Sequence, residues 1–443
     1  MKRDIELRLH DWKHSDRRKP LILRGARQVG KTWSLKSFGE QHYKQVAYLN
    51  FEEMPTASQL FQADLTPQRI VTEISLLLDI NIIPGDTLII LDEIQACSAA
   101  LNSLKYFFEH ANQYHVAAAG SLLGIKLSKP RSFPVGKVNF LDLFPLSFSE
   151  FLQAMGKSKL RQYIDNIDRP EPLSTPIHEQ LIGLLKHYTF IGGMPEVVNH
   201  YVESKDLRTV RAIQKEVLDA YLLDFAKHAE AHEVMKITTV WKQIHSQLAK
   251  ENKKFIFSAI RKSARGRDYE SAIQWLQDAG LIYKVLNLST AKIPPDAYVR
   301  ENIFKIYLFD VGLLGALADL PASVLVEDDR LFTEFKGALI ENLVATILAP
   351  DSGKKLYYWS SQNRAEVDFV IPCELNLYPL EVKAGISRKK KSLLVYGEKF
   401  RPPQLSRTTL MNLRQDGRIV NIPLYLLHRF KHLVDCSGRV AKN

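Results

Sequence analysis

The sequence predicts an α/β protein of several domains, and three patterns along its 443 residues support this prediction. From about residue 20 to 150, short apolar runs alternate with helical patterns, as in a doubly wound parallel sheet. From about 180 to 290 a 3.6-residue period dominates and predicts helices. After about residue 300, strand patterns return around a long helical pattern. We therefore predict domains over 1–165, 166–300 and 301–443.

The first domain takes its predicted sheet from runs that are apolar without alternation. Strands of a parallel sheet have this character because helices cover both faces. A helical pattern over Asn102–His110 lies between two of the runs. The runs that we predict as strands are Leu21–Leu23, Gln45–Phe51, Thr87–Leu91, His115–Ala119 and Val138–Leu143.

A glycine-rich loop follows the first run and precedes a helical pattern. It reads GARQVGKT and fits G-x-x-x-x-G-K-[ST], the pattern of a P-loop. Backbone N–H groups and the helix N-terminus of such a loop bind phosphates, while its lysine reaches the β- and γ-phosphates and its hydroxyl binds Mg²⁺. We therefore predict ATP and Mg²⁺ as ligands. The predicted nucleotide-binding residues of the loop are Gly25, Ala26, Arg27, Gln28, Val29, Gly30, Lys31 and Thr32.

An acidic pair, Asp92 and Glu93, ends the apolar run TLIIL. We predict that Asp92 holds Mg²⁺ together with Thr32, and that Glu93 polarises the water that attacks the γ-phosphorus. An acidic pair at a strand end can also be a solvated loop, but the P-loop favours the catalytic interpretation. No G-x-G-x-x-G follows the first strand, so a dinucleotide-binding fingerprint is absent from the sequence there.

Further polar residues follow the fourth run. Ser121 either contacts the γ-phosphate or caps the next helix. The transition state also requires positive charge, for which Arg131, Lys137 or an arginine from a neighbouring subunit of a homo-oligomer are candidates. We predict Lys31, Glu93 and Lys137 as the catalytic residues of the first domain.

The middle domain combines helical patterns with basic side chains. The patterns Leu207–Lys227 and Met235–Leu248 precede a basic turn, a helix that ends at Ala279–Gly280, and a β-run, which together indicate a winged helix. Such a domain would present its cations to DNA phosphates. The alternative is a solvated basic face on a helical linker. The cations are Lys250, Lys253, Lys254, Arg261, Lys262, Arg265 and Arg267.

The C-terminal third carries Glu341 in a helical pattern, Asp368 in the strand AEVDFVI, and Glu381 and Lys383 in LEVKA. Because side chains alternate along a strand, Glu381 and Lys383 share one face. The order Glu, Asp, Glu-x-Lys resembles the PD-(D/E)xK nuclease core, where carboxylates bind Mg²⁺ and the lysine assists cleavage. The resemblance implies a restriction-endonuclease-like α/β domain with Glu341, Asp368 and Glu381 as metal ligands. The alternative is a pair of amphipathic strands with charged outer faces.

Longer segments give a family resemblance over nearly the whole chain. The chain resembles the prokaryotic AAA-superfamily ATP-binding proteins that carry a C-terminal domain of unknown function numbered 4143. The resemblance implies an AAA-like fold for the first domain, with ATP binding and hydrolysis. Gly136-Lys137 stands where the family usually has Gly-Arg. The segments are LILRGARQVGKT, LIILDEIQ, AAAGSLLG, FLDLFPLSFSEFL, FIGGMPEVV, YLLDFAKHA, FKIYLFDVGLL, FKGALIENLV and the tail WSS…EVDFVI…LEVKAG.

Composition limits the remaining classes. Hydrophobic residues make up 46% and charged residues 25% of the chain, which is typical of a folded protein. The cysteines Cys97, Cys373 and Cys436 form no C-x-x-C pair, so we expect neither structural zinc nor a disulfide framework. The charged N-terminus and the lack of any long apolar stretch predict a cytoplasmic protein without a membrane partner. A net charge of +11 favours DNA or RNA as a partner.

These patterns lead to one functional hypothesis and an alternative. The hypothesis is an ATPase whose nucleotide state controls a nucleic-acid-directed, nuclease-like C-terminal domain. The alternative is a nucleotide-dependent regulatory switch that binds a protein or DNA partner, with a catalytically inactive C-terminal domain.

Overall fold

The chain divides into two compact units in the computed structural model. The first unit contains Met1–Phe144 with Asp278–Gly280, and the second contains Pro145–Gln277 with Leu281–Asn443. The structure describes residues 1–121, 136–250, 254–259, 265–321, 336–361, 365–383 and 391–434. In these parts of the chain, no helix combines the length and the apolar character needed to span a membrane.

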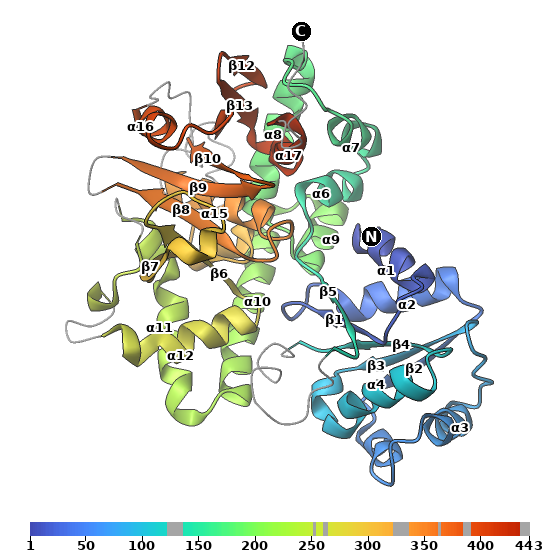
Figure 1. The fold of residues 1–443 in the computed structure, drawn as a ribbon. Helices are drawn as coiled ribbons and strands as arrows, with labels where there is room; N and C mark the ends of the chain where they lie inside the picture. The colour runs from blue at the N-terminus through green and yellow to red at the C-terminus, as the bar shows by residue number, and fades with distance from the viewer. Residues whose placement is uncertain are drawn as a thin grey trace. The chain divides into compact units, whose positions relative to one another are not determined.

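The first unit is built on a parallel sheet, drawn in blue to cyan in Figure 1. All strands that the sequence predicts are present. Their described order across the sheet is β2-β3-β4-β1-β5. The strands are β1 (Leu21–Arg24), β2 (Gln45–Asn50), β3 (Thr87–Asp92), β4 (His115–Ala119) and β5 (Asn139–Asp142).

Helices cover both faces of this sheet, which is why its strands are apolar throughout. Ala47 and Ile89 share a core with α3 and α4 on one face. On the other face, α2 packs so closely that a Cβ on Gly39 would lie 2.5 Å from a methyl of Val46. The helices of this unit are α1 (Ile5–His14), α2 (Lys31–His42), α3 (Pro67–Leu78) and α4 (Ser98–His110), with 3-10 turns at Pro55–Phe61 and Ile94–Ala96.

The second unit begins with helices. The sequence-predicted helices at Leu207–Lys227 and Met235–Leu248 are confirmed as α10 and α11. The helices before the strands are α6 (Phe148–Ala154), α7 (Ser158–Asp165), α8 (Thr175–Ile191), α9 (Pro195–Ser204), α10 (Leu207–His228), α11 (Ala231–Leu248) and α12 (Gly266–Asp278). Later come α13 (Val311–Leu317), α15 (Lys336–Leu348), α16 (Lys391–Phe400) and α17 (Phe430–Leu433), with 3-10 turns at Phe257–Ala259, Pro295–Tyr298 and Leu424–Arg429.

A buried aspartate joins distant helices of this unit. Asp310 is the N-cap of α13, because its Oδ1 accepts from the N–H of Leu313 at 2.9 Å. Its Oδ2 accepts from the N–H of Gly193 at 2.6 Å, between α8 and α9. A Cβ on Gly192 would lie 2.2 Å from Asp310, and one on Gly193 would lie 2.2 Å from the carbonyl oxygen of Leu146, so these close approaches require both glycines of the GG pair.

The second unit also contains a mixed sheet, yellow to red in Figure 1, whose described strands run in the order β12-β13-β11-β10-β9-β8-β6-β7. Strands β8, β9 and β10 are antiparallel neighbours, whereas β10 and β11 are parallel. The strands are β6 (Ile282–Leu288), β7 (Val299–Leu308), β8 (Leu356–Ser360), β9 (Glu366–Cys373), β10 (Asn376–Val382), β11 (Leu405–Thr409), β12 (Arg414–Asp416) and β13 (Ile419–Pro423).

The division of the chain differs from the predicted domain boundaries. A boundary at residue 300 would cut β7, whose residues pair with β6 in the mixed sheet. β6 and β7 form an antiparallel pair after α12, but β6 also pairs with β8. The helical middle and the C-terminal strands therefore share one unit, and the winged helix stays a prediction.

The cysteines differ in their state. Cys97 is a buried free thiol. Cys373 is disulfide-bonded, which the sequence analysis did not anticipate. One such bond is not the cysteine framework of a small secreted domain.

Candidate functional site

The P-loop connects β1 to α2 at the carboxyl edge of the parallel sheet. A Cβ on Gly25 would lie 2.3 Å from the carbonyl oxygen of Leu143, so only glycine fits at this position. Gly30 has a φ of 93° at the N-cap of α2, where other residues are strained. Both glycines of the motif are therefore required for the backbone path of the loop. This path continues directly into the N-terminus of α2.

Lys31 is 7% exposed. In the described part of the chain, its hydrogen-bond partners all belong to its own loop. Its Nζ donates to the carbonyl oxygens of Gly25 at 3.1 Å and Ala26 at 2.8 Å. Burial lowers the pKa of Lys31 to about 8, although the charges of Glu93 and Asp92 oppose the shift. An anion that entered the loop would stabilise the ammonium form.

Asp92 and Thr32 come together as the sequence predicts. Asp92 ends β3 and is 1% exposed, and its Oδ2 accepts from the hydroxyl of Thr32 at 2.7 Å. The same oxygen accepts from the Tyr48 hydroxyl at 3.0 Å. Burial and the charge of Asp92 raise the pKa of Tyr48, so the phenol stays a donor. Sequence reasoning missed Tyr48, which reaches Asp92 from the neighbouring strand β2.

Glu93 follows in a left-handed backbone conformation, with a φ of 47°. Such a conformation is unusual for a non-glycine residue and is often found at functional sites. Its carboxylate accepts from the Gln95 side chain and, at 3.5 Å, from the Ser121 hydroxyl. Ser121 is thus brought to Glu93, while the helix that it was predicted to cap lies outside the described residues.

The rest of the loop is held from outside the motif. The carbonyl of Val29 accepts from Nη1 of Arg3 at 2.9 Å, and Nη2 of Arg3 donates to the carbonyl of Phe144 at 2.7 Å. Arg27 lies 4.0 Å from Glu52 as a partly exposed ion pair. Gln28 has a φ of 62°, so it supplies the left-handed turn inside the loop.

Lys137 is not brought to the P-loop, in contrast to its predicted catalytic role. It precedes β5 and pairs with Glu109 at 3.1 Å, near the end of α4. Because β5 runs parallel to β1, the residue before β5 lies at the amino edge of the sheet, and the P-loop lies at the carboxyl edge. The position of Lys137 therefore does not fit its predicted catalytic role. Arg131 lies outside the described residues.

A second polar cluster lies in the mixed sheet of the second unit. It contains the predicted residues Glu341 from α15, Asp368 from β9, Glu381 from β10 and Lys383 directly after β10, and also Lys305 from β7, which sequence reasoning missed. Nζ of Lys305 lies 2.6 Å from Glu366, 3.8 Å from Glu341 and 4.0 Å from Asp368. Lys383 pairs with Glu381 at 2.7 Å.

A bulge in β9 places Asp368 in this cluster. Trp359 pairs with Val367 and Tyr357 with Val370, so Asp368 and Phe369 both stand opposite Tyr358. The extra residue re-aims the strand. The Asp368 carboxylate then accepts from the N–H of Val382 at 2.7 Å.

The electrostatics of the cluster depend on burial and on the close charges. Burial raises the pKa of Asp368 to about 7, and Glu341 adds to the shift. Burial lowers the pKa of Lys305, but Glu341, Glu366 and Asp368 outweigh this effect and raise it overall. Tyr307 donates to Glu341 at 2.7 Å. Within the described part of the chain, no three His, Cys, Asp or Glu side chains are arranged to hold a metal ion. The ammonium of Lys305 lies among the carboxylates, and the metal-ligand role of Glu341, Asp368 and Glu381 stays a prediction.

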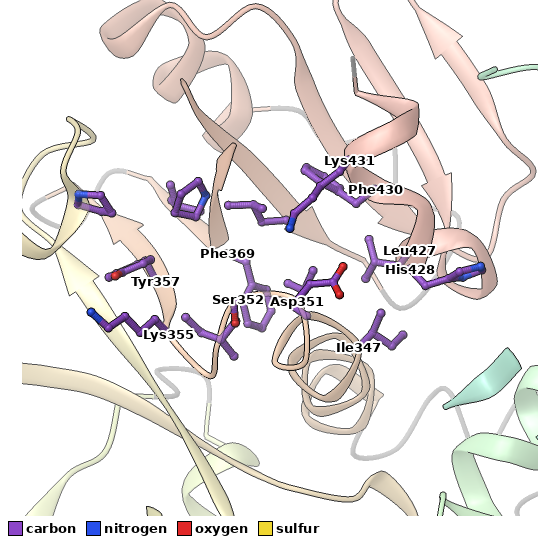
Figure 2. A pocket seen from close by; sticks show the side chains of 16 residues that line it. Ile347, Asp351, Ser352, Lys355, Tyr357, Phe369, Leu427, His428, Phe430 and Lys431 are labelled. Carbon is purple, nitrogen blue, oxygen red and sulfur yellow. The ribbon is translucent and has the colours of Figure 1, made fainter. Parts of the chain in front are cut away.

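A separate cavity of about 330 Å³ lies in the same unit (Figure 2). The end of α15, strand β9 and the segment before α17 line it, with Ile347, Phe369 and Phe430 among the apolar residues. None of the predicted site residues lines this cavity.

Comparisons with protein families match the chain in segments. Residues 17–152 match the model of an AAA domain, which shows that the first unit contains an AAA-type, ATPase-like domain. Residues 182–324 match a domain of unknown function numbered 8612, and residues 336–427 match the domain of unknown function numbered 4143 that the sequence analysis named. Lys305 and Glu341 therefore come from different family segments.

Known relatives cover less of the chain. Uncharacterised proteins Rv2008c of Mycobacterium tuberculosis and Mb2031c of Mycobacterium bovis are each 35% identical over 96 residues, 20% of this chain and 21% of the relative. The chain thus matches about a fifth of the length of these relatives.

Among solved structures, the Orc1 protein of Aeropyrum pernix in complex with DNA has a TM-score of 0.27 at 15% identity, covering 73% of this chain and 94% of that one. AMPPCP-bound DnaA of Aquifex aeolicus has a TM-score of 0.28 at 14% identity, covering 61% and 85%. Scores this low carry no argument about function.

Proposed function

We propose that the first unit binds ATP with Mg²⁺ and hydrolyses the γ-phosphate. The observation that carries this proposal is the contact of 2.7 Å between the Thr32 hydroxyl and Asp92, beside the buried Lys31 of the P-loop. The contact joins the hydroxyl that begins α2 to the carboxylate that ends β3. The AAA-domain match of residues 17–152 supports the same proposal.

The donor set of this site fits Mg²⁺. Mg²⁺ prefers hard oxygen ligands, and Thr32 and Asp92 offer a hydroxyl and a carboxylate at the mouth of the loop. When bound, Mg²⁺ supplies positive charge to the phosphate oxygens. Thr32 and Asp92 are the residues that would hold it.

The protein groups have separate roles in the proposed reaction. Lys31 exchanges its carbonyl partners for phosphate oxygens, since a charge-assisted bond to an anion is stronger than one to a carbonyl. Glu93 accepts the proton of the attacking water, so that the new P–O bond forms as the bond to the leaving ADP breaks. Gln95 and Ser121 hold the carboxylate of Glu93 and act as positioning residues.

The test separates ATP binding from turnover. Glu93→Gln keeps the size of the side chain but loses the base, so we expect phosphate release to fall about 10²- to 10⁴-fold while ATP affinity stays within about threefold. Glu109→Gln is the matched control, because Glu109 lies near the end of α4, beside Lys137. Equal turnover by Glu93→Gln and the parent protein would contradict the assignment of Glu93.

A second candidate function is that the second unit acts on nucleic acid and that the nucleotide state of the first unit controls this action. The observation that favours it is the gathering of Glu341, Asp368 and Lys383: the charge of Glu341 raises the pKa of both Asp368 and Lys383. A catalytically inactive domain in a regulatory switch is the alternative. Incubation with labelled DNA or RNA, Mg²⁺ or Mn²⁺ and ATP decides between them, since only the first predicts cleavage that Lys383→Ala abolishes.

The basic middle is proposed to contact phosphates of the nucleic acid. Of its cations, Lys250, Lys254, Arg265 and Arg267 lie in the described part, whereas Lys253, Arg261 and Lys262 lie outside it. Affinity for duplex DNA should fall steeply with salt, and replacing the cations with alanine should flatten that dependence. Unchanged salt dependence in the variant would contradict this interface.

A further inference from the structure

We infer that Lys305 is the resident cation of the carboxylate cluster in the second unit, where it competes with divalent metal ions for the same oxygens. Lys305 is 1% exposed, and its ammonium lies within 4.0 Å of carboxylate oxygens of Glu341, Glu366 and Asp368. These carboxylates come from α15 and β9, whereas Lys305 comes from β7. A metal ion bound between them would require the same oxygens.

The register of the sheet explains how Lys305 reaches β9. Lys305 pairs with Val285 on β6, and β6 pairs with β8, where Asn287 stands beside Tyr358. The side chain passes over the ring of Tyr358, with Nζ 4.9 Å from its centroid. Tyr358 stands opposite Asp368 because of the bulge in β9. The aromatic face and the carboxylates thus direct the ammonium into the cluster.

The charges of the cluster are not balanced by lysines alone. Glu341, Glu366, Asp368 and Glu381 face the ammonium groups of Lys305 and Lys383. Oε2 of Glu381 is buried and has no hydrogen-bond partner among the described residues. The cluster therefore has more carboxylates than ammonium groups, and Lys305 is the lysine whose Nζ lies within 4.0 Å of three of them.

Removing Lys305 should convert the cluster into a metal site. Without the ammonium, the carboxylates repel one another in a buried site, which a divalent cation relieves. We expect Lys305→Met to bind Mn²⁺ and Mg²⁺ at least roughly tenfold more tightly than the parent protein, and to gain a larger metal-induced rise in Tm. This expectation concerns the same cluster as the second candidate function but does not require any cleavage.

The experiment uses the full chain with Asp92→Asn in every variant, so that the P-loop does not contribute metal binding. Binding is measured by Mn²⁺ titration with electron paramagnetic resonance, and Tm is measured with EDTA, Mg²⁺ or Mn²⁺. Lys305→Arg should behave like the parent protein, because it keeps the charge. Lys284→Met is the matched control: Lys284 is a half-buried lysine of β6 that lies over the ring of Phe304.

The inference is supported if Lys305→Met alone gains metal affinity and if adding Asp368→Asn removes that gain. Equal Mn²⁺ affinity of Lys305→Met and the parent protein would overturn it. If Lys305→Met does not fold, Mn²⁺ titration of the parent protein still tests the inference. Tight, micromolar Mn²⁺ binding that depends on Asp368 would show that Lys305 does not compete with the metal ion. Cleavage assays are scored separately, so failure of the second candidate function does not affect this test.

Discussion

Lys31 and Lys305 are buried lysines in different units, and their pKa values move in opposite directions. Burial lowers the pKa of Lys31 to about 8, and the nearby Glu93 and Asp92 do not reverse this shift. Burial also lowers the pKa of Lys305, but the adjacent carboxylates reverse the shift and raise it. Both side chains are almost fully buried, so their partners, and not their exposure, make the difference.

The direct partners of these lysines explain the contrast. Lys31 donates to backbone carbonyls, which are dipoles, and no carboxylate of the described residues forms an ion pair with it. Lys305 contacts Glu366 at 2.6 Å, so its counter-ion is part of the protein. A buried lysine held by carbonyls is ready for an incoming anion, whereas one held by carboxylates forms an internal ion pair.

The largest expected effect is on stability. Removing one partner of a buried ion pair leaves an uncompensated charge, so Lys305→Ala should lower the free energy of unfolding by about 3–5 kcal/mol in EDTA. Lys31→Met removes a charge that burial already disfavours, so it should be neutral or stabilising. Urea denaturation measures both changes. A larger loss for Lys31→Met than for Lys305→Ala would break the comparison.

The next effect is on ATP affinity. A charge-assisted contact to phosphate contributes about 1.5–3 kcal/mol, so Lys31→Ala should weaken ATP binding roughly ten- to a hundredfold. Lys305→Arg should leave ATP affinity unchanged, because Lys305 lies in the other unit. Isothermal titration calorimetry measures both affinities. Unchanged binding by Lys31→Ala would show that its ammonium does not contact the phosphates.

A smaller effect concerns pH. The pKa of Lys31 is about 8 in the folded protein and 10.5 ordinarily. Between these two pH values the unfolded state binds more protons than the folded state. The contribution of Lys31 to the free energy of unfolding therefore rises with pH in this range. Bound phosphates favour the ammonium, so ATP affinity should fall as pH rises above 8. Calorimetry at pH 8.5 in buffers of different ionisation enthalpy should show net proton uptake on ATP binding. Lys31→Met should show no such uptake.

The smallest effect is expected at Lys137. Its pair with Glu109 is partly exposed, and such pairs contribute roughly 0–1 kcal/mol. Because Lys137 lies at the amino edge of the sheet, Lys137→Ala should keep ATP turnover within about twofold of the parent rate. A hundredfold loss of turnover would restore Lys137 to the catalytic residues and would require the loop before β5 to reach the nucleotide.

The sequence already contains the reason why Lys137 lies away from the P-loop. The predicted strand Val138–Leu143 already placed Lys137 before its first residue, and a parallel strand then puts it at the edge away from the P-loop. Lys305 also left a signal, because it interrupts the apolar strand FKIYLFD. A lysine in such a strand is almost never fully buried without a charged partner.

The sequence by itself determined the P-loop and its acidic partner. Gly25 to Thr32 are consecutive, so their loop is local, and Asp92 follows an apolar strand that can only end at the same edge as the loop in a parallel sheet. It also determined the strands of the first unit, because strands buried on both faces are apolar throughout.

Only the tertiary structure decided which side chains complete each site. Tyr48 and Arg3 reach the P-loop residues from other elements, and no spacing in the sequence encodes those contacts. In the second unit, a bulge in β9 sets the position of Asp368, and the order of the strands brings Lys305 to carboxylates of α15 and β9. The strand pattern allowed a metal site, but the ammonium of Lys305 from β7 lies there instead. Pairing register and sheet order decide this position, and neither is a property of a single segment.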